Sequence, residues 1–125
     1  MNTKVLVYIL VSVSMSAIAQ ITLKVGMSSE KMKHALSGAV GRFDALWFMV
    51  TDFFVITGLS IYFIGALVWL LVLAKIDVSV AYPFVGLGFI LTMAAGALFL
   101  GEPLGMQRMI GTFLVVAGVT LVAQT

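Results

Sequence analysis

Four polar residues recur every four positions within a long apolar run: Ser12, Ser16, Gln20 and Lys24. On a helix they fall along one face, which drifts slowly around the axis. A buried amide needs partners in hydrocarbon, so Gln20 should face protein, water or a ligand. The stripe has two interpretations. It is either a packing seam of small residues that ends in a lysine reaching to the interface, or the lining of a polar path.

Three further residues are candidates for binding chemistry. Tyr82 precedes Pro83 early in another apolar run, and Glu102 and Arg108 flank the break after that run. A cation binds phosphate and a carboxylate binds an amine or sugar hydroxyls, while an apolar groove holds a long tail. Lys24 and Glu102 should lie at one membrane edge, where an amphiphile with a charged head would fit. Alternatively, these two residues only anchor helix ends or pair with each other.

The chain lacks most of the residues that proton-coupled transport, catalysis or metal binding would need. No Asp or Glu falls inside the long apolar runs, whereas proton-coupled export of a cation usually uses a membrane-embedded acid. There is no cysteine, and the one histidine, His34, lies among lysines, where we expect it to be solvated. We therefore expect no enzymatic activity, no cofactor and no metal site.

The composition is that of an integral membrane protein. The 125 residues are 62% hydrophobic and 10% charged, with a mean hydropathy of +1.21. The net charge is +2, and the basic residues lie beside apolar runs, so anionic lipid rather than nucleic acid is the expected counter-charge.

Four apolar runs are long enough to act as membrane spans, because a helix rises about 1.5 Å per residue and must cross roughly 30 Å of hydrocarbon. The predicted spans cover residues 4–24, 53–74, 78–101 and 107–124, in a single membrane domain over 1–125. The fold class is thus an all-α four-helix membrane bundle. The first run also imitates a signal peptide, with Ala17-Ile18-Ala19 as a cleavage site, but its length and the three later spans favour a span.

The connections between spans differ in length. Residues 25–52 form a long connection in which the part around Trp47 and Phe48 suits a short interfacial helix. Thr51 or Asp52 should cap the second span, whose aromatic residues we expect to face lipid or to pack. Because residues 75–77 make a very short turn, spans two and three should be adjacent and antiparallel.

The last span carries Gly111 and Gly118, seven residues apart on one side. Such a stripe lets another helix pack closely, and in a terminal helix that partner can belong to a second subunit. Alternation of four spans places Lys24, Glu102 and Arg108 at one membrane face. The bias of Lys and Arg between the two faces is too slight to assign an orientation.

The stretch from Trp69 to Pro103, WLLVLAKIDVSVAYPFVGLGFILTMAAGALFLGEP, followed by MIGTFLVVAGVTLV, resembles the small four-helix members of the drug/metabolite transporter superfamily. These include the small multidrug resistance proteins and the EamA-like proteins. The chain is most similar to the subunits that flip 4-amino-4-deoxy-L-arabinose-phosphoundecaprenol, and Gln20 and Lys24 look like the Gln-x-x-x-Lys segment of those subunits. The multidrug branch is similar in Tyr82 and in the Gly111/Gly118 spacing, but its coupling glutamate would fall at Ser16, which cannot exchange a proton.

The resemblance implies a multi-pass protein of the bacterial inner membrane that works as a homodimer or with a related small subunit. It implies a flippase, or flippase subunit, for an undecaprenyl-phosphate-linked amino sugar. One alternative is a small multidrug exporter of lipophilic cations, with Tyr82 and Trp69 at the substrate. Another is a non-transporting subunit of a glycolipid-modifying complex.

Overall fold

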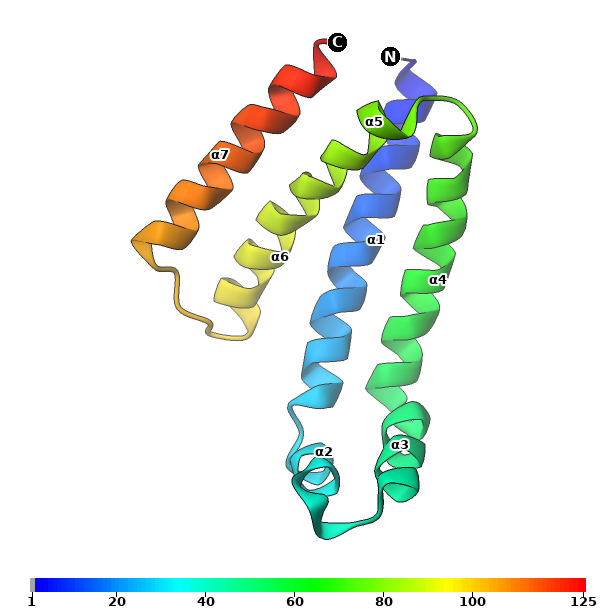
Figure 1. Cartoon of the computed structure of the whole chain (residues 1–125), viewed down its shortest axis with the longest axis vertical. Coiled ribbons are helices and arrows are strands. Elements are labelled where there is room, and N and C mark those ends of the chain that lie inside the picture. The colour runs from blue at the N-terminus through cyan, green and yellow to red at the C-terminus, as the bar shows by residue number, and fades with distance from the viewer. Residues whose placement is uncertain (1) are drawn as a thin grey trace.

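The computed structural model describes residues 2–125, and within that range the chain forms helices and no strands (Figure 1). Four helical segments are long and apolar enough to cross a membrane. They are α1 (Thr3–Met27), α4 (Phe53–Leu73), the segment Val78–Phe99 and α7 (Met106–Ala123). The predicted fold class, an all-α bundle with four spans, is therefore confirmed.

The third span is a broken helix. It consists of α5 (Val78–Ala81), the 3₁₀ turn η2 (Tyr82–Val85) and α6 (Gly86–Phe99). Pro83 lies inside η2, where its missing N–H prevents a regular α-helical hydrogen bond. The helix therefore changes type at Tyr82 and Pro83 before α6 begins.

Helices α1 and α4 make the closest contact in the bundle (Figure 1). Two glycines of α4, Gly58 and Gly65, bring the backbones together. A Cβ added at Gly58 would lie 2.7 Å from Leu23 Cγ, and one at Gly65 would lie 3.2 Å from Met15 Cβ. The antiparallel pair therefore depends on the missing side chains at these two positions.

Helix α6 packs against α1 and α7, with little contact to α4 (Figure 1). Spans two and three are antiparallel, as predicted, but they are adjacent only at the short turn, where α5 stays near the end of α4. At Gly86, α7 comes close enough that an added Cβ would lie 2.7 Å from Val115 Cγ1. The bundle order is thus α4, α1, α6, α7.

The main core lies toward the end of the bundle that carries both termini (Figure 1). Its buried residues come from all four spans: Val5, Ile9, Val13, Val72, Ala81, Phe84 and Val119. Val119 is the only buried residue of α7. The helices are therefore joined at this end, and much apolar surface of the last two spans stays uncovered by the chain itself.

At the other end, α6 stops at a left-handed glycine. Gly101 has φ of +68°, and the amide of Glu102 donates a 3.1 Å hydrogen bond to the carbonyl of Gly96. A positive φ at the end of a helix favours glycine because it has no Cβ. This turn fixes where Glu102 leaves the helix.

The long connection folds into α2 (Glu30–His34), the π-helical turn η1 (Ala35–Ala39) and α3 (Arg42–Thr51), beyond the ends of α1 and α4 (Figure 1). Asp52, one of the two predicted caps, accepts hydrogen bonds from the amides of Phe54 and Val55 at 3.1 and 3.2 Å. No residue of α3 is buried. That α3 lies at a membrane interface stays a prediction.

Candidate functional site

A cavity of about 200 Å³ lies between α4 and the broken third span, with α1 as its floor. It brings together Ser16 and Tyr82, two of the residues singled out in the sequence. Polar or aromatic side chains supply much of the remaining lining: Ser12, Tyr62 and Trp69. The cavity exists because α6 departs from α4 and leaves this side of α1 open.

The cavity combines a few hydroxyls with a mainly apolar lining and contains no charged residue. The hydroxyl of Ser12 donates a 2.8 Å hydrogen bond to the carbonyl of Gly65, so it is already satisfied. Ser16, Tyr62 and Tyr82 offer hydroxyls, and Trp69 offers an indole ring. Such a lining can accept hydroxyl groups or an apolar chain, but it contains no carboxylate, histidine or lysine.

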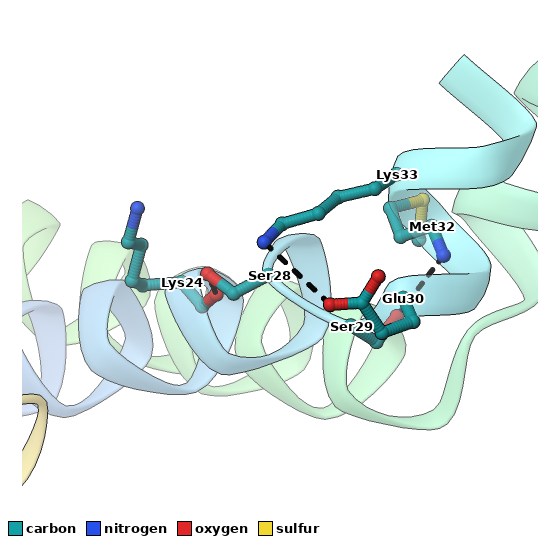
Figure 2. Close-up of polar contacts among 6 residues, drawn as sticks. All are labelled: Lys24, Ser28, Ser29, Glu30, Met32 and Lys33. Atoms are coloured by element: carbon teal, nitrogen blue, oxygen red, sulfur yellow. Dashed lines mark hydrogen bonds and ion pairs between the residues drawn. The ribbon is translucent and has the colours of Figure 1, made fainter. Parts of the chain in front are cut away.

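Gln20 and Lys24 continue the line of Ser12 and Ser16 along α1 and are both exposed. Each step of four residues turns the helix by about 40°, so the line drifts from Ser12, which is buried against α4, to Gln20 and Lys24, which are exposed. Figure 2 shows the Lys24 side chain standing away from Ser28, whose hydroxyl donates to the Lys24 carbonyl at 2.6 Å. The sequence predicts that Gln20 faces protein, water or a ligand. In the isolated chain its side chain is exposed.

The ion pairs of the chain do not involve Lys24. In the part of the chain that the structure describes, the one ion pair joins Lys33 and Glu30, with Nζ and Oε1 3.9 Å apart (Figure 2). The alternative that Lys24 and Glu102 pair with each other is therefore wrong. Nor do any three His, Cys, Asp or Glu side chains among residues 2–125 lie close enough to hold a metal ion.

A second hollow, of about 550 Å³, lies between α6 and α7 at the loop end of this hairpin. We name it the α6–α7 groove. Its lining combines two charged residues, two threonines, three large apolar side chains and a glycine: Glu102, Arg108, Thr92, Thr112, Phe89, Met93, Val115 and Gly111. The structure thus places Glu102 and Arg108 together, whereas Lys24 lies on another helix outside this groove.

Local backbone contacts hold both charged side chains of the groove. The Glu102 carboxylate lies against Gly96, where an added Cβ would come within 2.7 Å of Oε1. The Arg108 guanidinium donates a 2.9 Å hydrogen bond to the carbonyl of Pro103. Glu102 and Arg108 form no ion pair with each other. Within residues 2–125 the one ion pair joins Lys33 and Glu30.

Gly111, at the edge of the α6–α7 groove, and Gly118 both lie where α7 is not in contact with another helix of the chain. Both are exposed, and a Cβ added at either would meet nothing within 4 Å. Neither glycine is therefore used to pack α7 against this chain. The dimer contact expected at this stripe stays a prediction.

Two cavity residues, Tyr62 and Trp69, were expected to face lipid or to pack, and Trp69 was considered a substrate contact only for an exporter of cations. Both line the cavity with Gly65, which contacts α1. The signal was present, because positions 62, 65 and 69 are three and then four residues apart and share one face of α4. Thr92 and Thr112 in the α6–α7 groove had no comparable signal.

Comparison with known proteins gives a consistent set of relatives. The chain is 33% identical over 87 residues to a protein of Pseudomonas syringae pv. syringae, and the match covers 70% of this chain and 79% of that protein. It is 43% identical over 60 residues to a protein of Pseudomonas fluorescens and 37% identical over 65 residues to one of Enterobacter sp.. These two matches cover about half of this chain and 53% and 61% of the relatives.

All three relatives are named probable 4-amino-4-deoxy-L-arabinose-phosphoundecaprenol flippase subunit ArnE. No family model and no solved structure matches the chain. The four apolar helices and these relatives identify a multi-pass protein of the bacterial inner membrane. On the length and identity of the first match, the chain belongs to the family of ArnE-type flippase subunits.

Proposed function

We propose that this protein is a flippase subunit that helps to move an undecaprenyl-phosphate-linked amino sugar across the inner membrane. Its relatives are named for this activity on 4-amino-4-deoxy-L-arabinose-phosphoundecaprenol. The substrate has a charged, hydroxylated head and a very long apolar tail. It therefore needs a path that is polar on one side and open to lipid on the other.

The observation that carries the proposal is the polar face of α1 between α4 and α6. Gln20 lies seven residues before the end of α1, so it is roughly 10 Å inside that end at 1.5 Å per residue. An exposed amide at this depth would face hydrocarbon, which cannot hydrogen-bond to it. We infer that a substrate head or a second subunit covers Gln20 during transport.

The same face gives the head group a sequence of contacts. Lys24 is near the membrane edge and offers a cation to a phosphate. Ser16, Tyr82 and the rest of the uncharged cavity lie further into the bundle and offer hydroxyls to the sugar. Since one side of the path is open in the single chain, we propose that a second copy or a related small subunit closes it.

Reconstitution into proteoliposomes tests the proposal. We would measure translocation of a labelled polyprenyl-phosphate amino sugar by the protein alone and together with a related small subunit. Gln20→Leu and Lys24→Gln should each lower the rate about tenfold, the effect of losing one hydrogen bond to a charged or buried group. Thr22→Val is the matched control, because the Thr22 hydroxyl donates to the Ile18 carbonyl of its own helix at 2.9 Å.

Each outcome decides between the candidate functions. Full transport by both variants would remove the polar face of α1 from the mechanism. Efflux of quaternary ammonium compounds driven by a pH gradient, without lipid translocation, would favour a multidrug exporter instead. An absence of transport by every reconstituted combination would favour a non-transporting subunit.

A further inference from the structure

The α6–α7 groove combines groups of opposite charge that do not neutralise each other. Glu102 and Arg108 both line it, yet they form no ion pair in the described part of the chain, residues 2–125. Both residues are exposed, and exposed opposite charges gain little by pairing, so each remains free for a ligand. The groove therefore offers a carboxylate and a guanidinium to one ligand that carries both an amine and an anion.

The way in which each side chain is held leaves most of its binding capacity available. Arg108 uses one N–H on the carbonyl of Pro103, and a guanidinium has five such donors. Its remaining N–H groups can form a bidentate contact with phosphate oxygens. Glu102 lies against the bare backbone of Gly96, so its carboxylate is placed by packing rather than by a cation.

The rest of the groove suits the part of an amphiphile next to its head. Phe89, Met93 and Val115 extend from the charged end along the two helices. The Thr112 hydroxyl donates to the Arg108 carbonyl at 2.8 Å and lies 3.2 Å from Met93 Sδ, which joins α7 to α6 at the groove floor. The charged end is at the α6–α7 loop, on the membrane face that also carries the end of α1 (Figure 1).

We propose that the α6–α7 groove is a recognition site that selects the lipid-linked amino sugar by its head group before the polar face of α1 receives it, a proposal that rests on the proposed function. The Glu102 carboxylate binds the ammonium group of the sugar, and the Arg108 guanidinium binds the phosphate that joins the sugar to the polyprenol. The first part of the apolar tail follows Phe89 and Val115. Glu102 thus determines selection of an amino sugar over a neutral one, while Arg108 supplies affinity for any polyprenyl phosphate.

The choice of this groove over the surroundings of Lys24 follows from charge. The side of α1 that carries Lys24 has a cation but no carboxylate in the cavity above it. It can therefore bind a phosphate, but it cannot distinguish an amine from a hydroxyl by charge. The α6–α7 groove, with a cation and a carboxylate, can bind the phosphate and also select the amine.

Binding to the full-length protein in detergent tests the assignment. Four ligands are compared: a decaprenyl-phosphate amino sugar, its N-acetylated derivative, decaprenyl phosphate alone and phosphatidylethanolamine. Wild type should bind the free amine about tenfold more tightly than the N-acetylated form, as expected for one charge-assisted contact. Glu102→Gln should bind both sugars equally, and Arg108→Gln should weaken all polyprenyl phosphates about tenfold while keeping the preference for the amine.

Matched controls come from the same membrane face. Asp44→Asn removes a carboxylate and Arg42→Gln removes a guanidinium at α3, outside the groove, and both should leave the binding profile unchanged. Retention of the amine preference in Glu102→Gln would overturn the assignment, and so would equal binding of phosphatidylethanolamine by wild type. If wild type bound none of the polyprenyl phosphates, the proposed function itself would fail.

Discussion

The hydroxyl of Ser12 donates a 2.8 Å hydrogen bond to the carbonyl of Gly65, and this bond joins α1 to α4 at the floor of the cavity. Ser12 is 6% exposed, whereas Gln20 and Lys24 are exposed further along the same face. The packing role is therefore observed at Ser12, whereas a path lined by the other members of the stripe stays a prediction. The first member of the stripe packs the helix pair, and its last two members are exposed.

Replacement of Ser12 by alanine should destabilise the α1–α4 pair by about 1 kcal/mol, a common value for one hydrogen bond between membrane helices. The Gly65 carbonyl then loses the hydrogen bond that the Ser12 hydroxyl donates to it. Unfolding in mixed micelles of increasing SDS content would measure the change. Ser60→Ala is the control, because the Ser60 hydroxyl donates to the Ile56 carbonyl within α4, and it should change stability much less.

Gly58→Ala should destabilise the protein by about 1–3 kcal/mol, the usual cost of inserting a methyl group into a packed contact. The new Cβ would lie 2.7 Å from Leu23 Cγ and 3.2 Å from the Ala19 carbonyl oxygen. The same unfolding assay applies. Gly111→Ala meets nothing within 4 Å and should leave monomer stability within about 0.5 kcal/mol, as for most exposed sites.

Gly118→Ile tests the predicted subunit contact on α7. If a second chain packs against Gly111 and Gly118, the larger side chain should shift the population from dimer to monomer without unfolding the chain, because the site is open within the monomer. Cross-linking in membranes or sedimentation in detergent would measure the ratio. An unchanged ratio would show that the subunits, if they associate, use another face.

Gly96→Ala should displace the Glu102 carboxylate, since the added Cβ would come within 2.7 Å of Oε1. A flexible side chain can move away at little cost, so stability should change by less than about 0.5 kcal/mol. The preference for a free amine over its N-acetylated form should fall nonetheless. Gly88→Ala is the control on the same helix, because its Cβ would make an ordinary contact, 3.6 Å from Val13 Cγ1.

Helix α3 exposes Phe43, Leu46, Trp47 and Val50, which share one face at spacings of three and four residues. If this face lies in the headgroup region, Trp47 in a Trp69→Phe background should emit at shorter wavelength in liposomes than in water. Lipids brominated near the headgroup should quench that emission. Efficient quenching by aqueous iodide would place α3 in solvent instead. The Trp47→Phe variant reports Trp69 alone.

The sequence was sufficient to predict the four spans, because uncharged runs such as 5–23 and 78–101 leave a helix across the bilayer as the one stable choice. It was not sufficient to predict their arrangement. The short turn at residues 75–77 suggested a paired hairpin, but η2 turns α6 away from α4 and onto α1. Turn length limits only the ends of two helices, whereas side-chain packing decides what happens along them.

Glycine spacing shows the same limit for the candidate site. Gly58 and Gly65 are seven residues apart, as are Gly111 and Gly118, but only the first pair contacts another helix of the chain. The spacing predicts a surface where a helix can pack closely. It does not indicate whether that helix belongs to the same chain or to a second subunit. Likewise, Glu102 and Arg108 were both candidates, but their shared groove depends on the turn at Gly101 and on the contact with Gly96.

The tight contact at Gly58 and Gly65 has a consequence for biosynthesis. Helices α1 and α4 precede α6 and α7 in the chain and leave the ribosome before them, and the two pack directly against each other. They can therefore close into a hairpin before α6 and α7 have been made, since domains and subdomains fold in order of synthesis when their contacts are local. The last two helices, whose contacts with that hairpin are few, would enter the membrane beside a preformed template.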